Sequence, residues 1–340
     1  NSSGNRIPET GSHAGCDNLA GRTVMVQEGE SPMRVSYHPD YFVELPQGHP
    51  FPMAKFPGLY EILLAEGVVA PGGVVRPKEA DMDLLRLVHT DEYLWKLSTG
   101  NLSRTEERRV GIPWSEGLWR RSRLAVAGTV NAGLMALEDG CAGNLAGGTH
   151  HAFPDHGQGF CVLNDVAICV RHLRRLGRIR RALVVDLDVH QGNGTAAIFH
   201  NDPEAYTFSI HGEKNFPARK TRSTLDIGLP CGTGDDRYME VLREALTRAI
   251  AESGPDCVFY LAGVDPAEGD RYGRMRLTRD GLERRDRFVL ETVRDAGLPI
   301  VLLLSGGYAA TPVHTAELHA IVFRQAKKVF LAHRSRAATG

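Results

Sequence analysis

The chain has 340 residues, of which 42% are hydrophobic and 24% are charged. These proportions are ordinary for a folded globular protein and exclude a largely disordered chain. Lysine and arginine number 40 against 41 for aspartate and glutamate, so the formal charge of −1 does not point to nucleic acid or to a basic partner. No run approaches the roughly 18 apolar residues of a membrane span.

Residues 1–32 differ in composition from the rest of the chain. They are polar, rich in glycine and serine, and have no apolar periodicity. We expect a disordered tail there, either native or a vector-derived leader, and a single folded domain over 33–335. The six cysteines are scattered without a CxxC pair, which favours reduced thiols and a cytoplasmic location.

From residue 34 onward, short apolar runs alternate with amphipathic stretches. The apolar runs predict buried strands at 182–189, 205–211, 257–265 and 299–304. The amphipathic stretches predict helices at 114–139, 235–252, 279–296 and 313–333. This alternation predicts an α/β fold in which one parallel sheet is sandwiched by helices.

Polar residues follow each of the four predicted strands. Asp188 and His190 end the first strand, Ser209–His211 end the second, Asp265 ends the third, and Ser305–Tyr308 follow the fourth. Ligands of open α/β sheets bind beyond the carboxyl ends of the strands. The sequence therefore predicts a functional site at this edge.

The densest of these clusters is VVDLDVHQGNG, residues 184–194. Asp186, Asp188 and His190 alternate, so on an extended strand all three side chains would share one face. Buried carboxylates need a cation, and mixed oxygen and nitrogen ligands suit zinc, iron, manganese or nickel. Asp265 completes a set of three ligands with Asp188 and His190 and leaves positions open, as in a catalytic metal site.

Two further segments carry candidate catalytic groups. His150 and His151 follow two glycines in GGTHH, and on a turn both could reach one pocket and transfer protons. In SGGYA, residues 305–309, the glycine turn directs Tyr308 inward, where its phenol could donate to an oxyanion or could simply pack.

Taken in order, the segments GGTHH, GFCVLND, DLDVHQGNG, SIHGEKNFP, LAGVDPAEGD and SGGY resemble the zinc-dependent histone deacetylases, which have the arginase/deacetylase fold. The resemblance covers about residues 34–330. Two stretches, HPFP at 49–52 and AEGDRYG at 267–273, are most similar to the class IV branch and its bacterial relatives.

The resemblance implies three cation sites. Zinc would be bound by Asp188, His190 and Asp265, and Fe²⁺ could replace it in the cell. A potassium ion would be held by residues around the same strand ends, namely Asp186, Asp188, His190, Ser209 and Ile210. A second monovalent ion would involve the backbone of Phe199. On this reading Asp186 is not a zinc ligand, because it accepts a hydrogen bond from the His150 ring.

The resemblance also implies catalytic roles for the tandem histidines and the tyrosine. His151 would take a proton from water and return it to the leaving amine, His150 would stabilise charge beside it, and Tyr308 would stabilise the oxyanion. Asn193 occupies the position that orients His151, where some branches have aspartate. A neutral amide raises the pKa of the histidine less than a carboxylate does.

A narrow substrate channel is implied as well. Phe160 and Phe216 would flank it, and the Gly159 carbonyl would accept the substrate N–H. We expect residues around Tyr37–Phe42 and Gly143–Gly147 to form the floor that sets acyl length.

Three rivals to the removal of acyl groups from lysine remain. Polyamine-selective relatives carry an acidic residue shortly after the third zinc ligand. Here Tyr272 lies seven residues past Asp265, and the neighbouring Arg271 would repel a polycation. Glu268 and Asp270 are acidic and close in sequence, so an acetylpolyamine substrate remains an alternative. A catalytically silent binder of acylated ligands and an arginase-like guanidine hydrolase are the other two, although the second needs more carboxylates than one ligand triad supplies.

Two stretches of the chain are basic. Residues 171–181, RHLRRLGRIRR, read as a solvated helix end and not as a nucleic-acid surface. A second basic loop near the expected rim either favours acidic substrates or is simply solvated; it contains Lys214, Arg219, Lys220 and Arg222.

Overall fold

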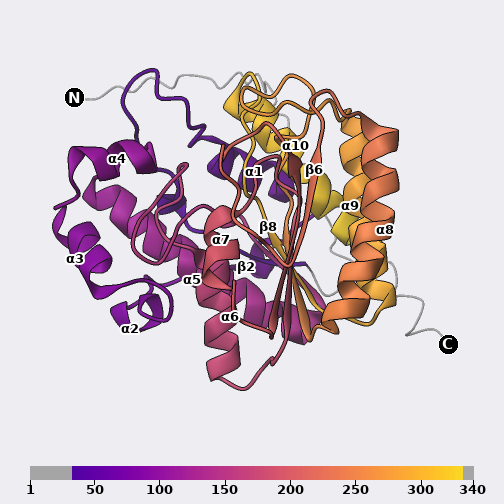
Figure 1. Cartoon of the computed structure of the whole chain (residues 1–340), viewed down its shortest axis with the longest axis horizontal. Coiled ribbons are helices and arrows are strands. Elements are labelled where there is room, and N and C mark those ends of the chain that lie inside the picture. The colour runs from indigo at the N-terminus through magenta and orange to yellow at the C-terminus, as the bar shows by residue number, and fades with distance from the viewer. Residues whose placement is uncertain (1–32, 332–340) are drawn as a thin grey trace, which may run out of the picture.

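The computed structural model of the chain describes residues 33–331, and the expected tail over 1–32 lies outside the described residues (Figure 1). Within the described part, eight parallel strands form one sheet in the order β2-β1-β3-β8-β7-β4-β5-β6. The strands are β1 (Arg34–Ser36), β2 (Val74–Val75), β3 (Cys141–Asn144), β4 (Ala182–Asp186), β5 (Ala205–Gly212), β6 (Leu225–Leu229), β7 (Cys257–Leu261) and β8 (Ile300–Leu303).

Helices cover both faces of this sheet. They are α1 (Lys55–Ala65), α2 (Met82–Leu85), α3 (Asp91–Thr99), α4 (Arg104–Val110), α5 (Glu116–Asp139), α6 (Asp165–Arg175), α7 (Asn193–Ile198), α8 (Asp235–Ser253), α9 (Arg279–Asp295) and α10 (Pro312–Ala326). Helices α5 and α6 pack together on one face, while α8 and α9 lie on the other, where α10 packs against both α9 and α1 (Figure 1). This three-layer arrangement confirms the predicted fold class.

Local sequence explains why these elements form. The central strands β4, β5, β7 and β8 are buried along their whole length, which is why they read as apolar runs; β3 is equally buried, but its sequence, CAGN, forms no such run and was not predicted. Helix α5 begins after Ser115, whose side chain accepts from the Leu118 N–H, and ends at Gly140 in the left-handed conformation. No helix among residues 33–331 is long and apolar enough to cross a membrane.

Two predicted strands are shorter than expected at the edge where the site lies. Strand β4 ends at Asp186 and not at 189, and β7 ends at Leu261 and not at 265. Beyond these points carboxylates take over as hydrogen-bond acceptors, because the Val189 N–H donates to Asp265 Oδ1 and the His190 N–H to Asp188 Oδ1, both at 2.8 Å. The expectation that Asp186, Asp188 and His190 share one face of an extended strand is therefore wrong.

The strand order explains why distant segments meet. Strands β3, β8, β7, β4 and β5 are consecutive neighbours, so the loops after their carboxyl ends lie side by side. These loops carry the GGTHH, SGGY, GVDPAEGD and DLDVH segments. The sheet thus brings the predicted functional residues to one edge.

Candidate active site

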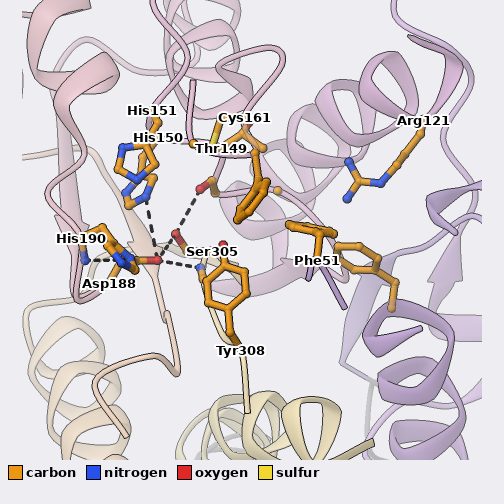
Figure 2. Close-up of a pocket in the computed structure, with 16 residues that line it drawn as sticks. Phe51, Arg121, Thr149, His150, His151, Cys161, Asp188, His190, Ser305 and Tyr308 are labelled. Atoms are coloured by element: carbon orange, nitrogen blue, oxygen red, sulfur yellow. Dashed lines mark hydrogen bonds and ion pairs between the residues drawn. The ribbon is translucent and has the colours of Figure 1, made fainter. Parts of the chain in front are cut away.

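The core of the site is a buried cluster of one imidazole and two carboxylates, formed by His190, Asp188 and Asp265, of which Figure 2 shows His190 and Asp188. The Nδ1 atom of His190 lies 3.0 Å from Asp188 Oδ1 and 3.1 Å from Asp265 Oδ2. One ligand atom of each residue lies within 4.8 Å of the others, and this is the only such group of three among residues 33–331. Asp186 is not part of it.

Backbone and hydroxyl donors fix the Asp188 carboxylate. Its Oδ2 atom accepts from the Gly306 N–H at 2.6 Å and from the Ser305 hydroxyl at 2.8 Å. Ser305 has a φ of 55°, a conformation that L-residues adopt at a cost. The turn after β8 is therefore shaped around this carboxylate.

The cluster has the chemistry of a divalent metal site. Burial and then the neighbouring charge of Asp188 raise the pKa of Asp265 to about 7, and a cation between the two carboxylates would favour their charged forms. One nitrogen and two oxygens that converge from two loops suit zinc or Fe²⁺. The residues present therefore fit such an ion.

The tandem histidines lie beside this cluster on a turn, and different groups orient them. His150 Nδ1 lies 2.7 Å from Asp186 Oδ2, and His151 Nδ1 lies 2.7 Å from Asn193 Oδ1. The Asn193 amide nitrogen donates to Gln158 Oε1, so its oxygen faces His151. His151 then donates from Nδ1 and keeps Nε2 unprotonated.

The pKa values of the two histidines shift in opposite directions, because their hydrogen-bond partners differ in charge. Burial lowers the pKa of His150, but the carboxylates of Asp186 and Asp188 more than offset burial and raise it to about 9. Burial, and then the charges of His150 and His190, hold the pKa of His151 well below its usual value. His150 is therefore the cationic member of the pair and His151 the neutral base.

Residues that the sequence reasoning missed hold the histidine loop in place. Asp165, at the start of α6, accepts from the Gly148 N–H at 3.0 Å, the Thr149 N–H at 2.8 Å and the Thr129 hydroxyl at 2.5 Å. Asn164 caps the same helix and donates to the Ala152 carbonyl at 3.1 Å. The signal available in the sequence was the Asn-Asp pair before an apolar helix, which is typical of a capped start.

Asp270 holds the tyrosine loop in a similar way. Its Oδ2 atom accepts from the Tyr308 N–H at 2.7 Å, and its Oδ1 atom accepts from the Tyr272 and Gly273 N–H groups at 2.9 Å each. The carboxylate is therefore occupied by the backbone. Tyr308 is 9% exposed and lines both cavities of the site.

The outer cavity has a volume of about 560 Å³ and opens to solvent past aromatic walls. Gly159, Phe160 and Phe216 all line it, as do His151, His190 and Tyr308. Gly159 has a φ of 55°, and a Cβ there would lie 2.7 Å from His151 Cδ2, so this position requires glycine. The structure therefore brings the predicted channel residues to the mouth of the site.

An inner cavity of about 40 Å³ continues past the metal cluster. Phe51, Phe56 and Arg121 line its inner end, and Figure 2 shows Phe51 and Arg121 on the side away from His190. The expected floor is largely wrong, because only Gly147 of the segments around 37–42 and 143–147 lines this cavity. Tyr41 lies one layer behind, where its carbonyl accepts from Arg121 Nε at 2.9 Å.

A second buried cation lies beside Arg121. Lys55 Nζ donates to the Ser305 carbonyl at 3.1 Å, and burial lowers its pKa to about 8 despite the charges of Asp265 and Asp188. Neither Lys55 nor Arg121 carried a signal in the sequence, since Lys55 begins α1 and Arg121 lies in α5, both far along the chain from the strand ends that form the site.

The residues of the two expected monovalent sites are placed as follows. Ser209 is opposite Asp186 across β4 and β5, and its hydroxyl contacts His211 Nδ1 at 2.9 Å, while Ile210 is buried beside it. Phe199 is buried at the end of α7, with the Arg171 guanidinium 6.0 Å from its ring centroid. Both ion sites stay predictions.

Comparison with known proteins adds to this geometry. Residues 49–323 match the histone deacetylase domain. The chain is 47% identical to an uncharacterized protein of Picosynechococcus sp. over 87% of this chain and 99% of that protein. It is 32% identical to histone deacetylase 2 of Arabidopsis thaliana, over 78% and 71% of the two chains.

Two further matches have lower sequence identity. The acetoin utilization protein AcuC of Bacillus subtilis is 30% identical over 67% of this chain and 65% of that protein. The crystal structure of the HDA15 HD domain superposes with a TM-score of 0.71 over 91% of this chain and 98% of that one, at 22% identity. The last likeness supports the fold alone.

Proposed function

The chain belongs to the histone deacetylase family and is a deacetylase-type hydrolase, and from this premise we propose that it is a zinc-dependent amidohydrolase that removes acetyl groups from lysine side chains. One observation carries the proposal. Asp188 and His190, both tandem histidines and Tyr308 line the same inner cavity, and Asp265 completes the metal cluster behind them. Within this proposal, residues 33–335 are the catalytic domain, and the class IV branch is the subfamily.

We assign the metal to Asp188, His190 and Asp265. Zinc, or Fe²⁺ in the cell, would supply a Lewis acid there that polarises the amide carbonyl and acidifies water. Asp188 is held by Gly306 and Ser305, so its oxygens are positioned before any ion arrives. Asp186, Ser209 and Ile210, with Asp188 and His190, remain our candidates for potassium, and Phe199 for a second monovalent ion.

The protein's own groups then move the protons. His151 is neutral with Nε2 unprotonated, so it can accept a proton from the attacking water and return it to the leaving amine. Asn193 keeps that ring in the required tautomer, and Asp186 keeps His150 cationic beside the developing negative charge. Tyr308 keeps its proton because burial holds its pKa well above the usual value, so it can donate to the oxyanion.

The size of the inner cavity favours a short acyl group. The void measures about 40 Å³, and Phe51, Phe56 and Arg121 line it together with Asp188, His190 and Tyr308, so little space is left for an acyl group. A long acyl chain would have to displace one of these buried side chains. We therefore propose acetyl as the preferred group.

A panel of lysine peptides with acyl groups from acetyl to myristoyl tests this proposal, with acetylated polyamines beside them and with and without chelator. The expected result is chelator-sensitive hydrolysis of the acetyl peptide, with kcat/KM falling as the chain lengthens. Cleavage of the polyamines alone would move the substrate to small amines. A protein that binds one zinc yet hydrolyses nothing would be a silent binder, and the proposal would fail.

A further inference from the structure

Four basic side chains converge on the mouth of the outer cavity. Arg108 and Arg109 come from α4, Lys214 from the loop between β5 and β6, and Arg274 from the loop after β7. All four are exposed, and we call them the basic rim. No aspartate or glutamate lines this cavity, so three separate segments supply charge of one sign only.

The basic rim is also unpaired. None of its four side chains forms an ion pair with an acidic residue within 33–331. Other surface arginines do so, as Arg324 does with Glu66 at 2.5 Å. Arg108 and Arg109 lie in the last turn of α4, where their positive charges interact favourably with the helix dipole. Lys214 and Arg274 lie in loops, so the dipole of a helix does not account for their charges.

The rest of the second basic stretch does not contribute to the rim. Lys220 donates to the Asn215 and Pro217 carbonyls at 2.6 Å each, so it closes its own loop. Arg219 and Arg222 do not line the cavity. The charge at the mouth therefore belongs to the basic rim, while Phe216 and Tyr272, 39% and 37% exposed, form an apolar collar inside it.

Resting on the proposed deacetylase function, we propose that the basic rim selects acetyl-lysines flanked by aspartate and glutamate. The acetyl-lysine side chain passes the aromatic collar, and the flanking carboxylates stay at the mouth beside Arg108, Arg109, Lys214 and Arg274. The same charges repel acetylpolyamines and acetyl-lysines in lysine-rich or arginine-rich segments.

The expected size of the effect follows from electrostatic steering. Like charges around a low-dielectric cleft raise the association rate of an oppositely charged ligand by roughly 10–10³-fold. The same charges repel ligands of the same sign, so the preference for acidic over basic peptides comes from repulsion as well as attraction. Because the groups are exposed, salt weakens the effect as the screening length falls from about 10 Å at 0.1 M to about 3 Å at 1 M.

Three peptides test the inference. Each has the same central acetyl-lysine, flanked by Asp and Glu, by Ser and Gly, or by Lys and Arg. We expect kcat/KM of the zinc-loaded protein to fall in that order, with about a tenfold span or more between the acidic and basic peptides at low salt. The span should narrow as sodium chloride is raised.

Two charge-reversed variants make the test specific. The double change Arg108→Glu and Arg274→Glu should invert the order of the acidic and basic peptides. The matched control is Arg178→Glu, because Arg178 is an exposed and unpaired arginine, within the described residues, on the loop between α6 and β4 at the opposite edge of the sheet. This control should keep the wild-type order, and the melting temperature of each variant shows that it folds.

The possible outcomes separate this inference from the proposed function. Hydrolysis of all three peptides with equal kcat/KM would overturn the inference and leave the deacetylase standing. If no peptide is hydrolysed, the proposed function fails, and fluorescence anisotropy then decides the inference from binding alone. Tighter binding of the labelled acidic peptide than of the basic one would support it, and equal binding would overturn it.

Discussion

Gly306 lies directly against both carboxylates of the metal cluster. A Cβ at this position would lie 2.6 Å from Asp188 Oδ2 and would collide with Asp265 Oδ2 as well. The Gly306 N–H also donates to Asp188. The absence of a side chain is therefore part of the metal site, as much as the ligands are.

We predict that Gly306→Ala weakens zinc binding by about 10–100-fold, as is typical when the support of a metal ligand is lost. Zinc affinity, measured by competition with a chromophoric chelator, checks this. The control is Gly72→Ala, where an added Cβ meets nothing within 4 Å. Wild-type affinity in Gly306→Ala would contradict the assignment of the ligands.

Tyr308 supplies a hydroxyl at the junction of the two cavities. We predict that Tyr308→Phe lowers kcat by about 10²–10³-fold, because one donor to the oxyanion is lost, while zinc content stays the same. Steady-state kinetics and metal analysis of the same sample check both parts. Tyr206→Phe is the control, since its hydroxyl contacts Glu252 at the far end of the sheet and its loss should leave kcat unchanged. A kcat close to that of the wild type in Tyr308→Phe would remove the tyrosine from the mechanism.

Among the elements, α9 joins the ends of β4 and β7 through a single buried side chain. Arg285 Nη1 donates to the Gly263 carbonyl at 2.6 Å and contacts the Leu187 carbonyl at 3.5 Å. Leu187 precedes Asp188, and Gly263 lies two residues before Asp265. Asp286 balances the charge, since its Oδ1 accepts from Arg285 Nε at 2.9 Å. Arg285 therefore positions the two loops that carry the carboxylate ligands.

We predict that Arg285→Met lowers the free energy of unfolding by about 3–5 kcal/mol, because it leaves Asp286 buried without its cation. The double change Arg285→Met and Asp286→Leu should recover much of this stability and still bind zinc more weakly, since the Gly263 carbonyl has lost its donor. Urea unfolding of the metal-free protein and zinc affinity separate the two effects. Full zinc affinity in the double variant would show that Arg285 serves folding alone.

At the scale of elements, sequence patterns predicted positions well and ends poorly. Helix α5 was predicted over 114–139 and spans Glu116–Asp139, because its cap and its apolar face are both local signals. The ends of β4 and β7 were missed because their extent depends on contacts between loops, such as the Val189 N–H with Asp265 Oδ1. The sequence of one strand does not indicate such a hydrogen bond between two loops.

At the scale of the whole molecule, buried neutral histidines tie stability to pH. Burial lowers the pKa of His89 to about 4, while its ring lies between the Pro154 carbonyl at 3.3 Å and the Asn164 N–H at 3.0 Å. Between pH 6.5 and pH 4 the unfolded chain binds a proton there that the folded protein does not. Stability conferred by neutral His89 is therefore lost as the pH falls through this window.

We predict that, as the pH falls from 6.5 towards 4, the free energy of unfolding of the metal-free protein decreases relative to that of His89→Gln, because only the wild type loses the contribution of neutral His89. The difference in slope should approach about 1.4 kcal/mol per pH unit, the value for one proton. Urea unfolding of both proteins across this range is the measurement. Parallel curves would show that His89 takes up its proton in the folded state as well.

Some residues of the site could be predicted from the sequence, and others depend on how distant segments pack together. The strand-end residues were predictable, because parallel strands deliver their polar ends to a common edge. Phe51, Phe56 and Arg121 at the inner cavity, and Lys55 at the Ser305 carbonyl, were not predictable, because their segments reach the site only through tertiary packing. Of the basic rim, only Lys214 was identified from the sequence, because the other three residues lie in segments far apart in the sequence.

The most direct test of the account is a zinc titration of the chelated, metal-free protein. Hydrolysis of one acetyl-lysine peptide and bound zinc are measured on the same samples, beside the variant Asp188→Ala. We expect the rate to rise with bound zinc and to saturate at one equivalent, while Asp188→Ala stays inactive and binds zinc weakly. Undiminished hydrolysis by the metal-free protein, or by Asp188→Ala, would contradict it.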